Sequence, residues 1–186
     1  MVSQFVSTHQ VGLLGDLDFN FPEGTHAIGR LDNHSEGLLI LTTNKKVTRL
    51  LFLGDTPHNR TYLVQINNIL SEENLHLLQS GITIRVKGGT DYITPPCDVT
   101  IVETPEHLYK TATTLKQYGS HTWLLITISE GKFHQVRKMM GAIRHRCKRL
   151  IRVSIEDMVL GDLEPGCVRE IEEHDFFKQL KIAPPY

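Results

Sequence analysis

The sequence predicts a domain of the α+β class. Most of its strand-like segments follow one another as in hairpins, and only a few helical segments lie between them. This mixture favours an α+β arrangement over a doubly wound parallel sheet. The chain has 186 residues, 40% of them hydrophobic, which is enough for one well-buried core or two small subdomains that share a sheet.

The first predicted elements are a buried strand and a short helix. Residues 37–43 (GLLILTT) form a continuous apolar run, which is typical of a strand that is covered on both faces. Asn44 can cap a short helix through Phe52, and Gly54 can end it.

A strand and a well-delimited helix are predicted next. Residues 61–66 (TYLVQI) alternate as a strand does. Residues 71–81 read as a helix, because Ser71 can cap it, two glutamates occupy its first turn and Gly81 can close it.

The second half of the chain predicts three further strands and one helix. The strands are 82–86, 98–103 and 123–129, and residues 104–122 read as an irregular insertion or a ragged hairpin. The helix is expected from about His134 to Cys147. Its apolar stripe has helical spacing and consists of Val136, Met139, Met140, Ile143 and Cys147.

Composition restricts the class of protein. No apolar run approaches the roughly 20 residues that span a bilayer, and no signal peptide is apparent, so we expect a cytoplasmic protein. Cys97, Cys147 and Cys167 are far apart and lack CxxC spacing, which is typical of reduced thiols. The ten histidines show no metal-ligand spacing, so we expect no metal site.

Charge is distributed unevenly along the chain. Residues 131–155 contain eight Lys or Arg and no acid, whereas residues 156–175 contain eight acids and one base. The basic segment can bind a polyanion, or it can be a solvated face paired with the acidic segment. Eight bases without an intervening acid favour RNA or DNA.

The predicted last helix would present a basic face. Lys132 and His134 stand at its start, where unpaired backbone N–H groups favour a phosphate. Arg137, one turn inside, could instead turn inward to meet a carboxylate. At helical spacing, one face would carry Arg137, Gly141, Arg144 and Lys148.

Two residues have both a structural and a functional interpretation. Asp32, in the segment Asp-Asn-His-Ser, can simply cap a turn, or it can be an ionised carboxylate at a pocket, with Arg30 or Arg137 supplying a cation. Tyr62 opens a strand, where it can pack against the core or offer its ring to a base.

Four blocks of sequence decide between these interpretations. GRLDNHSEGLLILTTN (29–44) resembles the catalytic motif of the RsuA/RluE branch of ribosomal RNA pseudouridine synthases. RTYLV (60–64) and EGKFHQVRKM (130–139) resemble the next two motifs. The closing pattern is similar to LIR (150–152) and LEPGCVRE (163–170), so the resemblance covers nearly the whole chain in the family's order.

The resemblance implies a fold, a reaction and a set of site residues. It implies a mixed, mainly antiparallel sheet with an active-site cleft between two subdomains, within one catalytic domain over residues 1–186. It implies that Asp32 is the catalytic aspartate in a loop shared with Arg30, that Tyr62 stacks on the target base, and that Arg137 pairs with Asp32. Leu150 would line the uracil pocket, and no cofactor or metal is required. Further RNA contacts are expected at Lys132, His134, Gln135, Lys138, Arg144 and Lys148.

The chain also departs from the family pattern. The strand with Lys-Pro-x-Gly that normally precedes the first motif is absent, as is an N-terminal S4 module, and Glu156 replaces a common glycine. The segment 104–122 and RLIR (149–152) favour the RluE subgroup, which acts on 23S rRNA. ITISEGKFHQV (126–136) is closer to RsuA, which acts on 16S rRNA. A non-catalytic ribosomal RNA-binding or assembly factor, and a histidine-metal hydrolase, are the alternatives from other classes. We expect a monomer.

Overall fold

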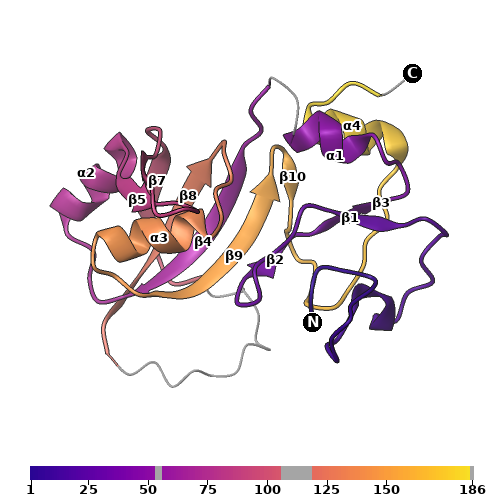
Figure 1. Cartoon of the computed structure of the whole chain (residues 1–186), viewed down its shortest axis with the longest axis horizontal. Helices are drawn as coiled ribbons and strands as arrows, with labels where there is room; N and C mark the ends of the chain where they lie inside the picture. Colours follow the sequence, from indigo (N-terminus) through magenta and orange to yellow (C-terminus); the bar gives the residue numbers. More distant parts are fainter. Residues whose placement is uncertain (53–55, 106–118, 185–186) are drawn as a thin grey trace. The chain divides into compact units, whose positions relative to one another are not determined.

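The computed structural model describes residues 1–52, 56–105 and 119–184, and the chain divides into two compact units. Unit 1 consists of residues 1–58 and 152–186, and unit 2 of residues 59–151. Helices and antiparallel strand pairs occur together, so the predicted α+β class is confirmed (Figure 1).

Unit 1 contains short elements from both ends of the chain. A 3-10 helix, η1 (Leu14–Asp16), is followed by β1 (His26–Ile28), β2 (Glu36–Gly37), β3 (Ile40–Thr42) and α1 (Val47–Phe52). β1 and β3 pair antiparallel. From the other end of the chain come β10 (Met158–Val159) and α4 (Glu173–Leu180). The buried apolar side chains of unit 1 include Leu14, Ile28, Leu38, Ile40, Val47, Leu51, Ile155, Met158, Phe177 and Leu180.

Unit 2 is built on longer strands. β4 (Arg60–Asn67) pairs antiparallel with β8 (His121–Ile128), and β8 pairs antiparallel with β7 (Asp98–Val102). β9 (Cys147–Ile155) pairs with the other edge of β4. It continues past residue 151 into unit 1, where β10 and β2 pair with it. The remaining elements of unit 2 are α2 (Glu72–Ser80), the pair β5 (Thr83–Arg85) and β6 (Asp91–Ile93), and α3 (Gln135–Ala142).

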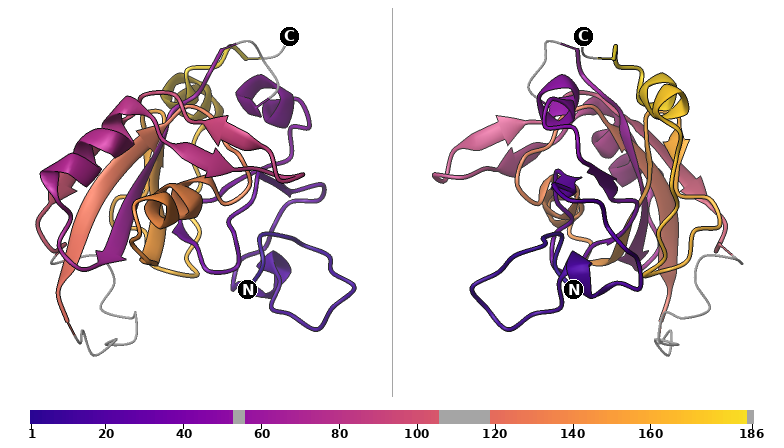
Figure 2. Two further views of the ribbon diagram at one scale, coloured as in Figure 1. Left: turned by 60° about the vertical axis from the view of Figure 1, so that its left-hand side comes forward. Right: turned by 90° about the vertical axis from the view of Figure 1, so that its right-hand side faces the viewer.

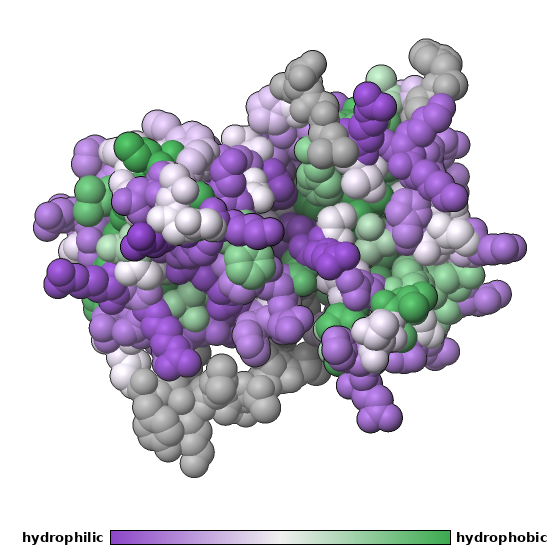
Figure 3. Space-filling model, in the orientation of Figure 1, coloured by the Kyte–Doolittle hydropathy of each residue, from purple (hydrophilic) through white to green (hydrophobic). Residues whose placement is uncertain are grey.

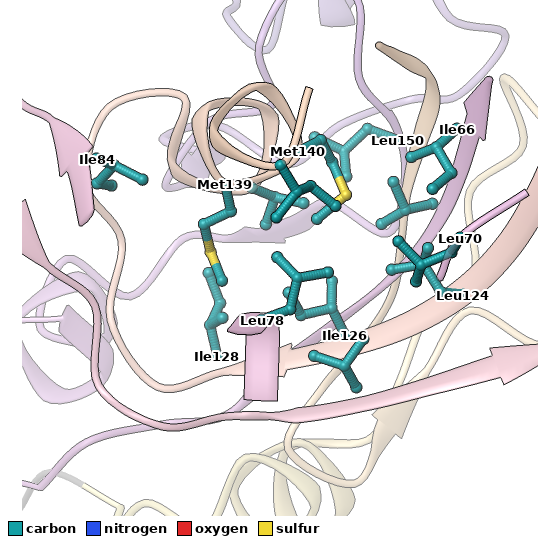
Figure 4. Packing of buried hydrophobic residues seen from close by; sticks show 14 residues of the cluster. Ile66, Leu70, Leu78, Ile84, Leu124, Ile126, Ile128, Met139, Met140 and Leu150 are labelled. Carbon is teal, nitrogen blue, oxygen red and sulfur yellow. The ribbon is translucent and has the colours of Figure 1, made fainter. Parts of the chain in front are cut away.

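The core of unit 2 lies between its sheet and its two helices. Met139 of α3 points towards Ile128 of β8, and Leu78 of α2 lies beside Ile126 of the same strand (Figure 4). Ile84 of β5 joins this core cluster, and β5 packs against α3 (Figure 2). Full burial of several large aliphatic side chains contributes about 1.5–3 kcal/mol for each of them, so this cluster holds α3 firmly on the sheet.

Local chemistry explains the elements that were predicted correctly. The hydroxyl of Ser71 accepts a hydrogen bond from the backbone N–H of Asn74 at 3.2 Å, and Gly81 has a φ of 99° at the end of α2. The predicted strands 61–66 and 123–129 correspond to β4 and β8.

Two predictions for the first half of the chain are wrong. The run 37–43 is not one strand, because the left-handed φ of Gly37 (100°) separates β2 from β3. α1 begins at Val47, since the Asn44 side chain accepts from the N–H of Lys46 and forms a turn first. α1 extends through Phe52, as predicted. Gly54, which is predicted to end it, and most of the predicted insertion 104–122 lie outside the described residues.

The predicted helix from His134 to Cys147 ends five residues early. Arg144 adopts a left-handed conformation with a φ of 60°. Its N–H donates to the carbonyl of Gly141 at 3.0 Å, and the N–H of His145 donates to that of Met140 at 2.9 Å. This hydrogen-bond pattern is a Schellman motif, which closes a helix. Cys147 therefore begins β9 and does not extend the apolar stripe of α3.

Candidate functional site

The loop after β1 carries Asp32 and is fixed at its start by the N-terminal segment. The backbone N–H of Leu31 donates to the hydroxyl of Ser3 at 3.0 Å. The guanidinium of Arg30 donates to the side-chain oxygen of Gln4 at 3.1 and 3.2 Å, in the amide orientation that satisfies both groups. Arg30 is thus an exposed residue whose position is set within unit 1.

Asp32 begins a turn that its main chain closes. Its carbonyl accepts a hydrogen bond from the N–H of Ser35 at 2.8 Å, and its side chain is half-buried. This hydrogen bond joins main-chain atoms, so the turn that it closes does not by itself assign a role to the Asp32 carboxylate.

The end of the same loop is fixed by Arg152. The N–H of Leu38 donates to the carbonyl of Arg152 at 2.8 Å, and the Nε of Arg152 donates back to the carbonyl of Leu38 at 2.8 Å. A Cβ on Gly37 would lie 2.3 Å from the Arg152 carbonyl oxygen. Only glycine allows the two backbones to approach this closely. The sequence alone did not predict that Gly37 and Arg152 hold the end of this loop.

Tyr62 lies in the middle of the unit 2 sheet. It stands opposite Ile126 of β8, is half-buried and packs against the core cluster. Its neighbour Arg60 donates through Nη2 to the carbonyl of Ser129 at 3.0 Å, and burial lowers the pKa of the Arg60 guanidinium. A Cβ on Gly131 would lie 2.8 Å from Nη1 of Arg60, so this arginine packs closely against the segment after β8.

That segment, residues 129–135, is held by a chain of hydrogen bonds. The backbone N–H of Lys132 donates to Oε1 of Gln135 at 2.8 Å, and Nε2 of Gln135 donates to Glu130 at 2.7 Å. The hydroxyl of Tyr92 donates to the other Glu130 oxygen at 2.5 Å, and this hydrogen bond raises the pKa of Tyr92. Gln135 is only 4% exposed, so its amide orders the segment from within.

Arg137 lies one turn into α3 and is half-buried. Its charge acts on the thiol of Cys147, whose pKa burial raises and the Arg137 guanidinium lowers to a smaller extent. Leu150, on β9, is 4% exposed and belongs to the core cluster.

The structure groups some predicted site residues and separates others. Lys132, His134, Gln135 and Lys138 come together around the start of α3. The predicted common helix face of Arg137, Gly141, Arg144 and Lys148 is wrong, because α3 ends at Ala142 and Lys148 belongs to β9. Arg144 and Lys148 are both exposed. Asp32 and Arg30 belong to unit 1, and Tyr62, Arg137 and Leu150 to unit 2. The pairing of Asp32 with Arg137 stays a prediction.

A pocket of about 610 Å³ lies beside the same segment in unit 2. Its lining includes residues 94–100, residues 127–130 and Gln135, the one predicted site residue among them. Within residues 1–52, 56–105 and 119–184, no group of three His, Cys, Asp or Glu side chains could hold a metal ion. In the same ranges, no helix is long and apolar enough to cross a membrane.

Comparison with known proteins defines the class to which this fold and these motifs belong. A family model described as RNA pseudouridylate synthase matches residues 16–142, which is more than half of the chain and includes Asp32, Tyr62 and Arg137. The chain belongs to the RNA pseudouridylate synthase family. Among solved structures, it is similar to a pseudouridylate synthase with a TM-score of 0.70 and 27% sequence identity, covering 87% of this chain and 63% of that one. The predicted pseudouridine synthase fold is confirmed.

Relatives with more specific names are also similar to the chain. The ribosomal large subunit pseudouridine synthase E of Vibrio parahaemolyticus is 34% identical over 148 residues, covering 79% of this chain and 60% of the relative. The protein of the same name from Xanthomonas axonopodis is 31% identical over 167 residues, covering 89% of this chain and 85% of the relative. The chain thus spans less than two thirds of the length of its Vibrio relative.

Proposed function

We propose that this protein isomerises a specific uridine to pseudouridine in ribosomal RNA, and that the RNA is 23S rRNA. The observation that carries the proposal is the family match over residues 16–142, which includes the loop of Asp32. The names of the Vibrio and Xanthomonas relatives support the large subunit as the target. The family match supports the reaction, and only the names of the relatives support 23S rRNA as its substrate. The reaction and the substrate are therefore tested by separate experiments.

The reaction breaks the N1–C1′ glycosidic bond of the uridine, turns the uracil and joins C5 to C1′. Asp32 assists either by attacking the sugar or by removing its 2′ proton. Both routes require the ionised carboxylate, and a facing Arg137 would favour that form. Tyr62 stacks on the target base and relays the proton that leaves C5. If Asp32 attacks C1′, C5 later displaces the carboxylate from that carbon; if it removes the 2′ proton, that proton returns to C2′. In both routes C5 loses one proton and N1 gains one.

The target base has to leave its stack before it reacts. Extrusion costs a few kcal/mol, and contacts with phosphates supply much of the binding energy. The exposed cations Arg30, Lys132, Arg144 and Lys148 are suited to this role. Because Leu150 belongs to the core cluster, it would contact the uracil as part of an apolar floor.

The catalytic assignment is tested with Asp32→Asn. We expect this variant to form no pseudouridine in a 23S rRNA transcript while binding that RNA within about tenfold of the wild type, because phosphate contacts dominate affinity. Asp18→Asn is the matched control, since it makes the same change at an exposed position of unit 1. Full turnover by Asp32→Asn would refute the assignment.

The substrate is tested by mapping pseudouridines in 23S and 16S rRNA from a strain that lacks this protein. Loss of one site in 23S rRNA is the expected result, and a site lost from 16S rRNA alone would move the activity to the small subunit. If every site persists, the protein is not the enzyme for either RNA, and the non-catalytic binding factor becomes the better hypothesis.

We also propose that the protein acts as a monomer in the cytoplasm. A single catalytic domain with one basic segment can engage one RNA site without a second copy. Light scattering after size-exclusion chromatography gives the mass directly, and a mass of about twice 21.1 kDa would contradict the monomer.

A further inference from the structure

An exposed phenylalanine stands at the start of α3. Phe133 is 69% exposed, although aromatic side chains are usually buried at least in part. Its ring stacks on the ring of His134, with centroids 3.8 Å apart and planes 18° from parallel. The pair forms a flat aromatic surface, which we call the aromatic step.

The backbone under the aromatic step is held by hydrogen bonds. His134 adopts a left-handed conformation with a φ of 55°, and its ring lies against that of Phe133. The residues on either side of the step are tied together, because the N–H of Lys132 donates to Gln135, and Gln135 donates to Glu130. Binding of a ligand that stacks here would therefore cost little conformational entropy in the loop.

Two lysines lie over aromatic rings of this part of unit 2, one of them over Phe133 of the aromatic step. Nζ of Lys138 lies 5.5 Å from the centroid of the Phe133 ring, and Nζ of Lys132 lies 4.7 Å from the centroid of the Tyr92 ring. No acid occurs from residue 131 to residue 155, and the nearby carboxylate of Glu130 is occupied by Tyr92 and Gln135. An apolar surface with this charge favours an anionic partner that also offers a flat ring.

We propose that the aromatic step binds an unpaired nucleobase of the substrate RNA. The inference rests on the proposed function, since the base belongs to the RNA that carries the target. Proteins that bind single-stranded nucleic acids combine aromatic side chains for the bases with cations for the phosphates, and this is the combination found here. The face of unit 2 in Figure 3 is largely hydrophilic with small separate hydrophobic patches, which suits a nucleic acid better than a broad apolar protein interface.

The proposal is tested with a 12-nucleotide single-stranded RNA that carries 2-aminopurine at its centre. Asp32→Asn protein is the background, so that binding is measured without turnover. Phe133→Ala is expected to weaken binding about tenfold and to reduce the quenching of 2-aminopurine on binding. Phe133→Leu, which keeps an apolar side chain without a ring, should behave like Phe133→Ala, and Phe133→Trp should behave like the parent protein.

Ile69→Ala is the matched control, because Ile69 also lies in unit 2 and is also 69% exposed. It should leave affinity and quenching unchanged. Binding by Phe133→Leu within twofold of the parent, or equal losses with Phe133→Trp and Phe133→Ala, would overturn the proposal. Failure of the two proposals can be distinguished. A wild type that binds through Phe133 but forms no pseudouridine refutes the function alone, whereas full activity and unchanged KM in Phe133→Ala refute the aromatic step alone.

Discussion

Gly37→Ala should destabilise the protein strongly, because Gly37 lies directly against β9. A Cβ there would lie 2.3 Å from the carbonyl oxygen and 2.8 Å from the nitrogen of Arg152. These atoms cannot easily move away, since Arg152 and Leu38 exchange two hydrogen bonds of 2.8 Å. The φ of Gly37 is also 100°, a conformation that L-amino acids rarely adopt.

The two costs can be estimated separately. A non-glycine residue in a sparsely populated region of positive φ costs about 1–3 kcal/mol. Overlap with a tethered backbone adds about 1–3 kcal/mol, as overpacking does in cores. We therefore expect Gly37→Ala to lower the free energy of unfolding by about 3–4 kcal/mol, which is large for a single substitution.

Gly24→Ala separates the two costs in the same unit. Gly24 has a φ of 81°, but nothing lies within 4 Å of a Cβ at this position. Its φ is nearer to the left-handed minimum than that of Gly37, so we expect a cost at the lower end of the conformational range, about 1–2 kcal/mol.

Urea unfolding followed by circular dichroism compares the two variants with the wild type. With a slope of about 2 kcal/mol per molar urea, the midpoint should fall by about 1.5–2 M for Gly37→Ala and by under about 1 M for Gly24→Ala. Equal midpoints for the two variants would refute the reasoning, because the contact with Arg152 would then contribute nothing.

Two further predictions concern unit 2. Arg137→Ala should lower kcat for pseudouridine formation about a hundredfold, as loss of an electrostatic partner of a reacting group does, whereas Lys138→Ala should stay within about tenfold. Equal losses in single-turnover assays would count against the pairing of Arg137 with Asp32. Burial raises the pKa of the Cys97 thiol to about 11, so at pH 8 it is almost entirely protonated and its alkylation by iodoacetamide should be at least about a hundredfold slower than that of exposed Cys167. The Cys97 rate should keep rising from pH 8 towards pH 11, and peptide mass spectrometry that finds equal rates at pH 8 would contradict the burial of this thiol.

Elements with strong local signals could be predicted from the sequence. The helix 72–80 has a serine cap, two early glutamates and a closing glycine, and the apolar runs at 61–66 and 123–129 correspond to β4 and β8. The end of α3 could not be predicted, because Arg144 takes the left-handed position that glycine usually fills. Ile143 and Cys147 also continue the helical spacing, so nothing local shows that the second of them begins β9.

The candidate site divides in the same way. Asp32 and Tyr62 stand out only through their motifs, since an aspartate in a turn and a tyrosine in a strand are common in proteins of any function. The partners that order the site are further away in sequence. Arg152 is 114 residues from Leu38, and Tyr92 is 38 residues from Glu130. Such contacts leave no pattern of spacing, so tertiary structure is needed to find them.

The structure also gives a physical reason why the motifs of this family are dispersed along the chain. The loop of Asp32 is held at its start by Ser3 and Gln4 and at its end by Arg152, which belongs to the closing motif at residues 150–152. Gly37 belongs to the first motif and allows that contact. At least two motif residues therefore have a positioning role, because they fix the backbone on which the carboxylate stands. Arg152→Lys removes the Nε donor to the Leu38 carbonyl and keeps the positive charge. It should therefore weaken the attachment of the Asp32 loop to β9. Arg152 is only 3% exposed, so this effect would come from a residue within the fold.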